Sequence, residues 1–68
     1  MTPIPTPAQI ANARIFAGLT QAQLARAVGC SLDCVRHWEQ GSRRPAGLYL
    51  RALARTMRKL ARESHDRR

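Results

Sequence analysis

The chain has 68 residues, with twelve Lys and Arg residues against four Asp and Glu residues, so its formal net charge is +8. This length holds one domain with one small core and excludes a large substrate cavity. A surface that is positive over most of its area favours a polyanionic partner. Eleven of the twelve basic residues are arginine, and a guanidinium fork fits phosphate oxygens and guanine better than an ammonium group does. The composition therefore favours nucleic acid.

Other partners and activities find little support in the sequence. No apolar run approaches the roughly 20 residues of a membrane-spanning helix, and the N-terminus lacks the charged and hydrophobic regions of a secretory signal. We therefore expect a cytoplasmic protein with no membrane partner. The sequence shows no nucleotide-binding loop and no evident pair of catalytic acid and base, so we expect neither an enzyme nor a small-molecule ligand.

The two cysteines and a nearby histidine form a C-x3-C-x2-H string at Cys30, Cys34 and His37. The spacing matches no common zinc module, and a structural zinc site needs a fourth ligand. We therefore expect two reduced, partly buried thiols and neither a metal nor another cofactor. A disulfide between the two cysteines is the next alternative.

The first predicted helix covers about residues 7–17 and follows an N-terminal arm, residues 1–6, that we expect to be mobile. Thr6 and Gln9 have the spacing of a capping box, in which each side chain satisfies the other residue's backbone N–H. Gly18 supplies a left-handed stop at the end of the helix. The sequence therefore predicts both boundaries of this helix.

Two short helices are predicted next, over about residues 21–28 and 31–40. Thr20 and Ser31 are the capping residues at their starts. Gly29 ends the first of the two, so that only two or three residues connect them. A connection this short forces the helices to cross at a steep angle, which is typical of a helix-turn-helix unit.

A long final helix is predicted over about residues 46–63. Its apolar residues recur at spacings of three and four, at Leu50, Leu53, Met57 and Leu60. This periodicity indicates an amphipathic helix with arginines on its other faces. Residues 64–68 form a basic tail that we expect to be frayed.

Many of these residues recur at the spacing of a known family. They are Arg14, Gly18-Leu19-Thr20-Gln21, Leu24-Ala25, Gly29, Ser31, Val35 and Trp38-Glu39-x-Gly41-x-Arg43-x-Pro45. Over about residues 9–56 the chain resembles the Cro/CI-type, or XRE, family of helix-turn-helix regulators, of the minimal kind found with phages, antitoxins and anti-CRISPR genes. The resemblance implies an all-α, lambda-repressor-like domain over residues 7–63, with four or five helices, that binds double-stranded DNA.

In the resembling family the third helix lies in the major groove, so we expect base contacts from its outward residues. These are Ser31, Leu32, Asp33, Arg36 and His37. Arg36 suits guanine, Asp33 suits the amino group of cytosine, and Leu32 suits a thymine methyl group. Asp33 departs from the neutral residues that are commoner in the family, and its role is then to reject wrong sequences. Phosphate contacts are expected from Gln21, Gln40, Arg43 and Arg44.

The resemblance also implies an ion pair between Arg14 of the first helix and Glu39 at the end of the third. Such a pair fixes the angle of the recognition helix. Removing one partner lowers the stability of the fold by more than the intact pair contributes to it. We expect Trp38 in the core and not stacked on a base. Proteins that bind single strands usually display several aromatic residues on one surface, and this chain has only three in all.

The long final helix departs from the family's usual five-helix plan, because the expected break is missing. Its stripe at Met57, Leu60 and Ala61 exceeds what a small monomer covers, so we expect a homodimer at an inverted-repeat operator. Ile15 and Phe16 either join that interface or cap the final helix. The expected function is an autorepressor that binds double-stranded DNA, and the alternative is an antitoxin or other module that also holds a protein partner.

Overall fold

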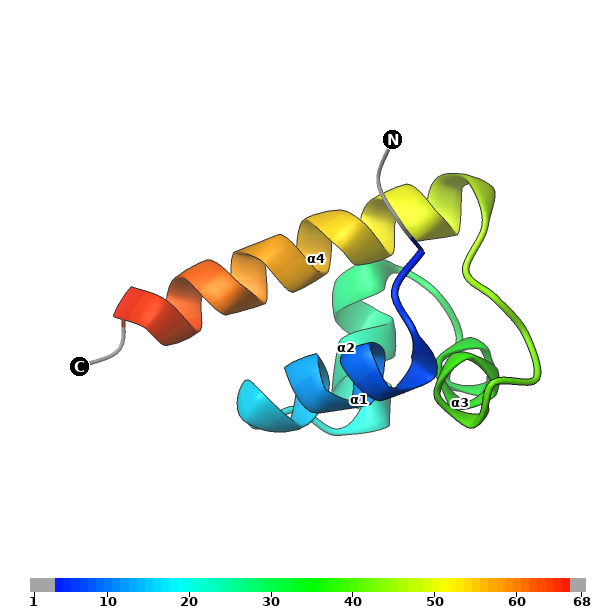
Figure 1. Cartoon of the computed structure of the whole chain (residues 1–68), viewed down its shortest axis with the longest axis horizontal. Coiled ribbons are helices and arrows are strands. Elements are labelled where there is room, and N and C mark those ends of the chain that lie inside the picture. The colour runs from blue at the N-terminus through cyan, green and yellow to red at the C-terminus, as the bar shows by residue number, and fades with distance from the viewer. Residues whose placement is uncertain (1–3, 67–68) are drawn as a thin grey trace.

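The computed structural model of the chain describes residues 4–66, with side chains described through residue 63. The described residues form α1 (Pro7–Phe16), α2 (Gln21–Val28), α3 (Leu32–Gln40) and α4 (Gly47–Asp66), and no strand. Figure 1 shows α4 lying along the molecule, with α1 and α2 against it and α3 at one end. The predicted all-α fold with a long C-terminal helix is confirmed, and it has four helices in the part described.

Local side-chain chemistry defines the start of each of the first three helices. Thr6 and Thr20 head complete capping boxes, in which each hydroxyl accepts from the backbone N–H three residues on, at 3.1 Å in both cases. The side chains of Gln9 and Gln23 accept in return from the two threonine N–H groups. Ser31 Oγ accepts from the backbone N–H of Cys34 at 3.2 Å. These bonds satisfy N–H groups that a helix start otherwise leaves without a partner.

The boundaries of two helices differ slightly from the prediction. The first helix ends at Phe16, because Ala17 is its C-cap and has a ψ of −4°, and Gly18 follows at a φ of +75°. The last helix begins at Gly47 and continues to Asp66, three residues past the predicted end at 63. Residues 64–66 contain neither glycine nor proline, so no helix breaker lies at the predicted end.

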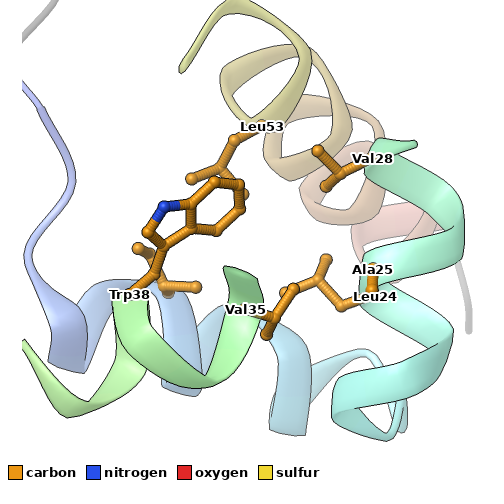
Figure 2. Packing of buried hydrophobic residues seen from close by; sticks show 7 residues of the cluster. Leu24, Ala25, Val28, Val35, Trp38 and Leu53 are labelled. Carbon is orange, nitrogen blue, oxygen red and sulfur yellow. The ribbon is translucent and has the colours of Figure 1, made fainter. Parts of the chain in front are cut away.

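All four helices contribute to one hydrophobic core. Its buried members are Ile10, Leu24, Ala25, Val28, Val35, Trp38 and Leu53. Figure 2 shows Val35 and Leu24 pointing toward one another between α2 and α3, with Leu53 of α4 beside the Trp38 ring. Trp38 is 3% exposed and meets Tyr49 edge-on, at 6.4 Å between ring centroids. The expectation that Trp38 belongs to the core is therefore confirmed.

A second set of residues is half-buried and packs against this core. It comprises Cys30, Cys34, Ala52, Met57 and Leu60. Both cysteines are free thiols, and burial raises the pKa of Cys30, with a further rise from the neighbouring Cys34. A raised pKa keeps the thiol protonated and unreactive near neutral pH. Cys30 and Cys34 both pack against the core.

Parts of the predicted arm and tail lie outside the described residues, namely residues 1–3 and 67–68. The described part of the arm, residues 4–6, leads into the Thr6 cap without regular structure. None of the helices in the described part combines the length and the apolar character that crossing a bilayer requires.

Candidate nucleic-acid interface

The connection between α2 and α3 is the tight turn that the sequence predicts. Gly29 has a φ of +91°, and the N–H groups of Gly29 and Cys30 both donate to the carbonyl of Ala25, at 2.8 and 2.9 Å. Ser31 then caps α3 directly. Only three residues therefore separate the two helices, so the crossing of α3 over α2 is set by backbone hydrogen bonds and by core packing.

The third helix divides cleanly into a buried face and an outward face. Val35 and Trp38 are buried in the core. The predicted base-contact residues Ser31, Leu32, Asp33 and Arg36 are all exposed, and Leu32 is a large apolar residue left 39% exposed. The structure thus brings a hydroxyl, an apolar side chain, a carboxylate and a guanidinium onto one projecting helix.

His37, the fifth predicted base-contact residue, is more constrained than the other four. It is half-buried, and its Nδ1 lies 2.8 Å from Ser42 Oγ in the loop after α3. The backbone N–H groups of Ser42 and Arg43 both donate to the carbonyl of His37, at 3.0 and 3.4 Å. The histidine ring and the loop therefore hold each other in place, and Nε2 is the ring nitrogen left for an outside partner. Ser42 has no counterpart in the sequence prediction.

The loop after α3 carries basic residues beside the outward face. Gly41 ends the helix at a φ of +83°, which turns the chain sharply. The expected phosphate-contact residues Gln40, Arg43 and Arg44 are exposed, and the next residue, Pro45, is buried. A buried proline with a fixed φ anchors the far end of the loop. The two arginines thus extend from a loop that is fixed at both ends.

An ion pair joins α1 to the C-terminal end of α3. Arg14 donates from Nε to Glu39 Oε2 at 2.8 Å and from Nη2 to Glu39 Oε1 at 3.1 Å, so the contact is bidentate. The two side chains are 17% and 8% exposed. A nearly buried fork of this kind fixes the direction of the helix that carries the glutamate. The structure therefore brings together the two residues that the resemblance paired.

Two further groups extend this pair in ways that the sequence did not reveal. Arg14 Nη1 donates to the carbonyl of Leu19 at 2.9 Å. Gln21 Nε2, expected to bind phosphate, donates to Glu39 Oε1 at 3.3 Å. The Gln21 side chain is thus tied into the ion pair at the N-terminus of α2. The first backbone N–H groups of a helix, here at Gln21 and Ala22, lack intrahelical partners and suit an anion.

Together these elements form a projecting helix with two segments near it that carry N–H donors. The outward face of α3 leads directly into the loop with Arg43 and Arg44, and the N-terminus of α2 meets the C-terminal end of α3 through the contact of Gln21 with Glu39. Donors, an acceptor and an apolar group on the helix suit the edges of base pairs in a major groove. The flanking amides and guanidinium groups suit the backbone phosphates.

A family model described as a helix-turn-helix domain matches residues 8–64 of the chain. The chain belongs to this helix-turn-helix family. No curated protein shows a significant match to it. The matched residues run from the first turn of α1 to the last turns of α4, so the family covers the whole core and the candidate interface.

The helix-turn-helix domain is a DNA-binding domain, and this protein is therefore a DNA-binding protein. Its α2 and α3 are the two helices of the motif, with α3 as the second one. Domains of this kind typically carry no catalytic activity.

In this helix-turn-helix protein, the residues expected at a dimer interface differ from one another in how exposed they are. Met57 and Leu60 are half-buried and pack against the core of their own chain, while Ala61 is exposed. Ile15 and Phe16 are 61% and 79% exposed, so they do not cap α4. Of these two places, the end of α1 thus carries the more exposed large apolar side chains. Helical periodicity alone did not show that the end of α1 is more exposed than the stripe at Met57 and Leu60.

Proposed function

We propose that the protein is a sequence-specific transcriptional regulator of the Cro/CI type that reads double-stranded DNA with α3. The observation that carries this proposal is the outward face of α3, whose exposed side chains are held at a fixed angle by the bidentate contact of Arg14 with Glu39. A fixed angle matters because hydrogen bonds to base edges require a defined register. Arg36 and His37 are the proposed donors to bases, with Ser31, Leu32 and Asp33 beside them.

Phosphate contacts hold the protein on the duplex in this proposal. Arg43 and Arg44 bind one backbone beside α3, and Gln40 lies next to them. The N-terminus of α2 binds the other backbone through its amides. The Gln21 side chain, which donates to Glu39, takes part in positioning the interface. These contacts contribute affinity and salt dependence, while the contacts of α3 contribute sequence preference.

We further propose that the active form is a homodimer on an inverted-repeat operator. Figure 1 shows the C-terminal end of α1 and the C-terminal half of α4 on the side of the molecule away from α3. The exposed apolar groups Ile15 and Phe16 lie at the first of these places, and Met57, Leu60 and Ala61 lie on the second. A two-fold contact there leaves both copies of α3 free to enter successive major grooves, about 34 Å apart.

The simplest regulatory consequence is autorepression. A dimer seated in two major grooves of its own promoter excludes the polymerase by occupying the site. The same exposed Ile15 and Phe16 support the alternative, a protein partner of the antitoxin type, because an aromatic side chain that is 79% exposed is a suitable anchor for another protein. A monomer that binds DNA would favour this alternative over the homodimer.

The test is fluorescence anisotropy with about 40 base pairs from upstream of the gene and a scrambled duplex of the same composition, at two salt concentrations. The proposal predicts a preference for the upstream duplex of about a thousandfold, weakened steeply by salt. Equal affinity for the two duplexes would exclude autoregulation. Loss of all binding at low salt would contradict the assignment of this interface to DNA.

A further inference from the structure

The outer face of α4 carries a stripe of positive charge that the proposed interface does not use. The residues of this stripe, called here the α4 stripe, are Arg51, Arg55, Arg58, Lys59 and Arg62, and all five are exposed. In the described part of the chain, the stripe side chains make no salt bridge and no hydrogen bond. The salt bridge found there joins Arg14 to Glu39. The five cations are therefore available to an outside partner.

The spacing of the α4 stripe gathers its charges on one face. At about 100° per residue, the five positions fall within an arc of roughly 100°. Leu53, the fully buried residue of α4, lies on the opposite side of the helix. Between residues 47 and 63 the one acidic residue is Glu63, which falls outside this arc. The stripe is thus a uniformly cationic face directed away from the core.

The charge density of the stripe matches that of a nucleic-acid strand. From Arg51 to Arg62 the helix rises about 17 Å, at about 1.5 Å per residue, so the stripe carries one charge per about 3 to 4 Å. One strand of a DNA duplex carries one phosphate per about 3.4 Å of axis. Four of the five cations are arginines, whose planar fork binds phosphate oxygens in pairs.

Other occupants fit this face less well. A membrane-surface helix inserts an apolar face between lipids, but the apolar face of α4, with Leu53, Met57 and Leu60, packs on the core of the protein. The centre of a protein interface is depleted of charge and holds aromatic anchors. The arc of the stripe contains no aromatic residue in the described part of α4, and Leu48 at its start is the one apolar side chain there.

The stripe is also separate from the surface around α3. α1 and α2 pack on the inner side of α4. Figure 1 shows α3 at one end of the molecule and the C-terminal half of α4 extending toward the other. Arg58 and Arg62 lie on that C-terminal half, and Arg55 lies just before it. A duplex held by α3 therefore leaves this part of the stripe open.

We infer that the α4 stripe is a second, sequence-independent binding surface for the phosphate backbone of double-stranded DNA. A molecule bound to one duplex through α3 then holds a second duplex, or a distant segment of the same DNA, along α4. This bridging goes beyond the proposed regulatory function and does not require an operator.

The experiment measures capture of a fluorescent second duplex by the protein bound to a bead-linked duplex. The test variant is R55Q/R58Q, and the matched control is R43Q/R44Q, which removes two charges from the loop after α3. All four arginines are exposed, so both variants should fold as the wild type does, which circular dichroism checks. Fluorescence anisotropy then measures the affinity of each variant for the upstream duplex, which is the second readout.

The inference predicts that R55Q/R58Q weakens capture of the second duplex about tenfold and lowers its salt slope by about 2, at about 0.9 per phosphate contact. The same variant keeps its affinity for the first duplex within about twofold, while R43Q/R44Q weakens that affinity. Capture by R55Q/R58Q at the wild-type level would overturn the inference. Tighter binding to phosphatidylserine vesicles, or to polyglutamate, than to the second duplex would overturn DNA as the occupant.

These outcomes are separable from failure of the proposed function. Sequence preference is measured by the upstream and scrambled duplexes alone, whereas capture uses a second duplex of unrelated sequence. A protein without sequence preference that still captures DNA through Arg55 and Arg58 would leave the α4 inference intact.

Discussion

The outward face of α3 and the outer face of α4 both present arginine to solvent, but they are built differently. The α3 face mixes chemical types, and its orientation is fixed by the Ser31 cap, the contact of His37 with Ser42 and the ion pair of Arg14 with Glu39. The α4 stripe has one chemical type, and its side chains make no hydrogen bonds in the described structure. Selectivity requires fixed and varied groups, whereas attraction to phosphates requires only charge. This difference is the reason why we propose that α3, and not α4, reads the sequence.

The largest expected effect tests whether the ion pair fixes α3. Arg14→Met removes both guanidinium bonds to Glu39 and leaves a carboxylate that is 8% exposed without its cation. We expect a loss of about 3 kcal/mol in the free energy of unfolding, measured by urea denaturation. The control is Arg26→Met, which changes an exposed arginine of α2 and should stay within about 0.5 kcal/mol of wild type. Equal losses for the two variants would show that the pair has no special role.

The second prediction concerns sequence reading by α3. Arg36→Ala removes an exposed fork from the proposed base-contact face and should lower the preference for the upstream duplex over the scrambled duplex about tenfold to a hundredfold. Arg55→Ala, the control on α4, should leave both affinities within about twofold of wild type and the ratio unchanged. The measurement is competition anisotropy at fixed salt. A ratio that falls equally in both variants would remove the distinction between the two faces.

The third prediction concerns the loop after α3. R43Q/R44Q should reduce the salt slope of binding to the upstream duplex by about 2, since each lost phosphate contact contributes about 0.9. The preference for the upstream duplex over the scrambled one should stay close to the wild-type value, because phosphate contacts carry no direct sequence information. Anisotropy over a series of salt concentrations checks this. An unchanged salt slope would show that Arg43 and Arg44 do not contact the phosphates.

The smallest expected effect concerns the turn between α2 and α3. At Gly29 an added Cβ meets no atom within 4 Å, but the φ of +91° is unfavourable for an L side chain. Gly29→Ala should therefore cost about 1 kcal/mol of stability through backbone strain alone. Gly29→Asn should cost less, because asparagine tolerates the left-handed region better. Thermal unfolding of the two variants compares them, and equal costs would show that strain is not the cause.

The helices and the turn could be predicted because their signals are local in the sequence. Thr6, Thr20 and Ser31 each act on an N–H three residues away, and Gly29 acts on its own backbone. The third helix and its outward residues therefore followed from short spacings. The end of α4 was predicted less well, because the charged residues after 63 do not stop a helix.

The contacts that tie the interface together depended on tertiary structure. The resemblance paired Arg14 with Glu39, but the approach of the Leu19 carbonyl and of the Gln21 amide depends on how α1 and α2 meet α3. Periodicity placed Met57 and Leu60 on one stripe of α4 without showing that the core of the same chain covers them in part. That outcome depends on the angle at which α4 crosses α1 and α2.

The most direct test of DNA reading by α3 is an amide NMR titration of the ¹⁵N-labelled protein with one equivalent of the upstream duplex. We expect the largest shifts at residues 31–37 and 41–44 and at the N-terminus of α2, with small shifts along residues 51–62. That pattern would mean that α3, and not α4, contacts the upstream duplex in the complex. Large shifts confined to residues 51–62, with α3 unchanged, would contradict the assignment of sequence reading to α3.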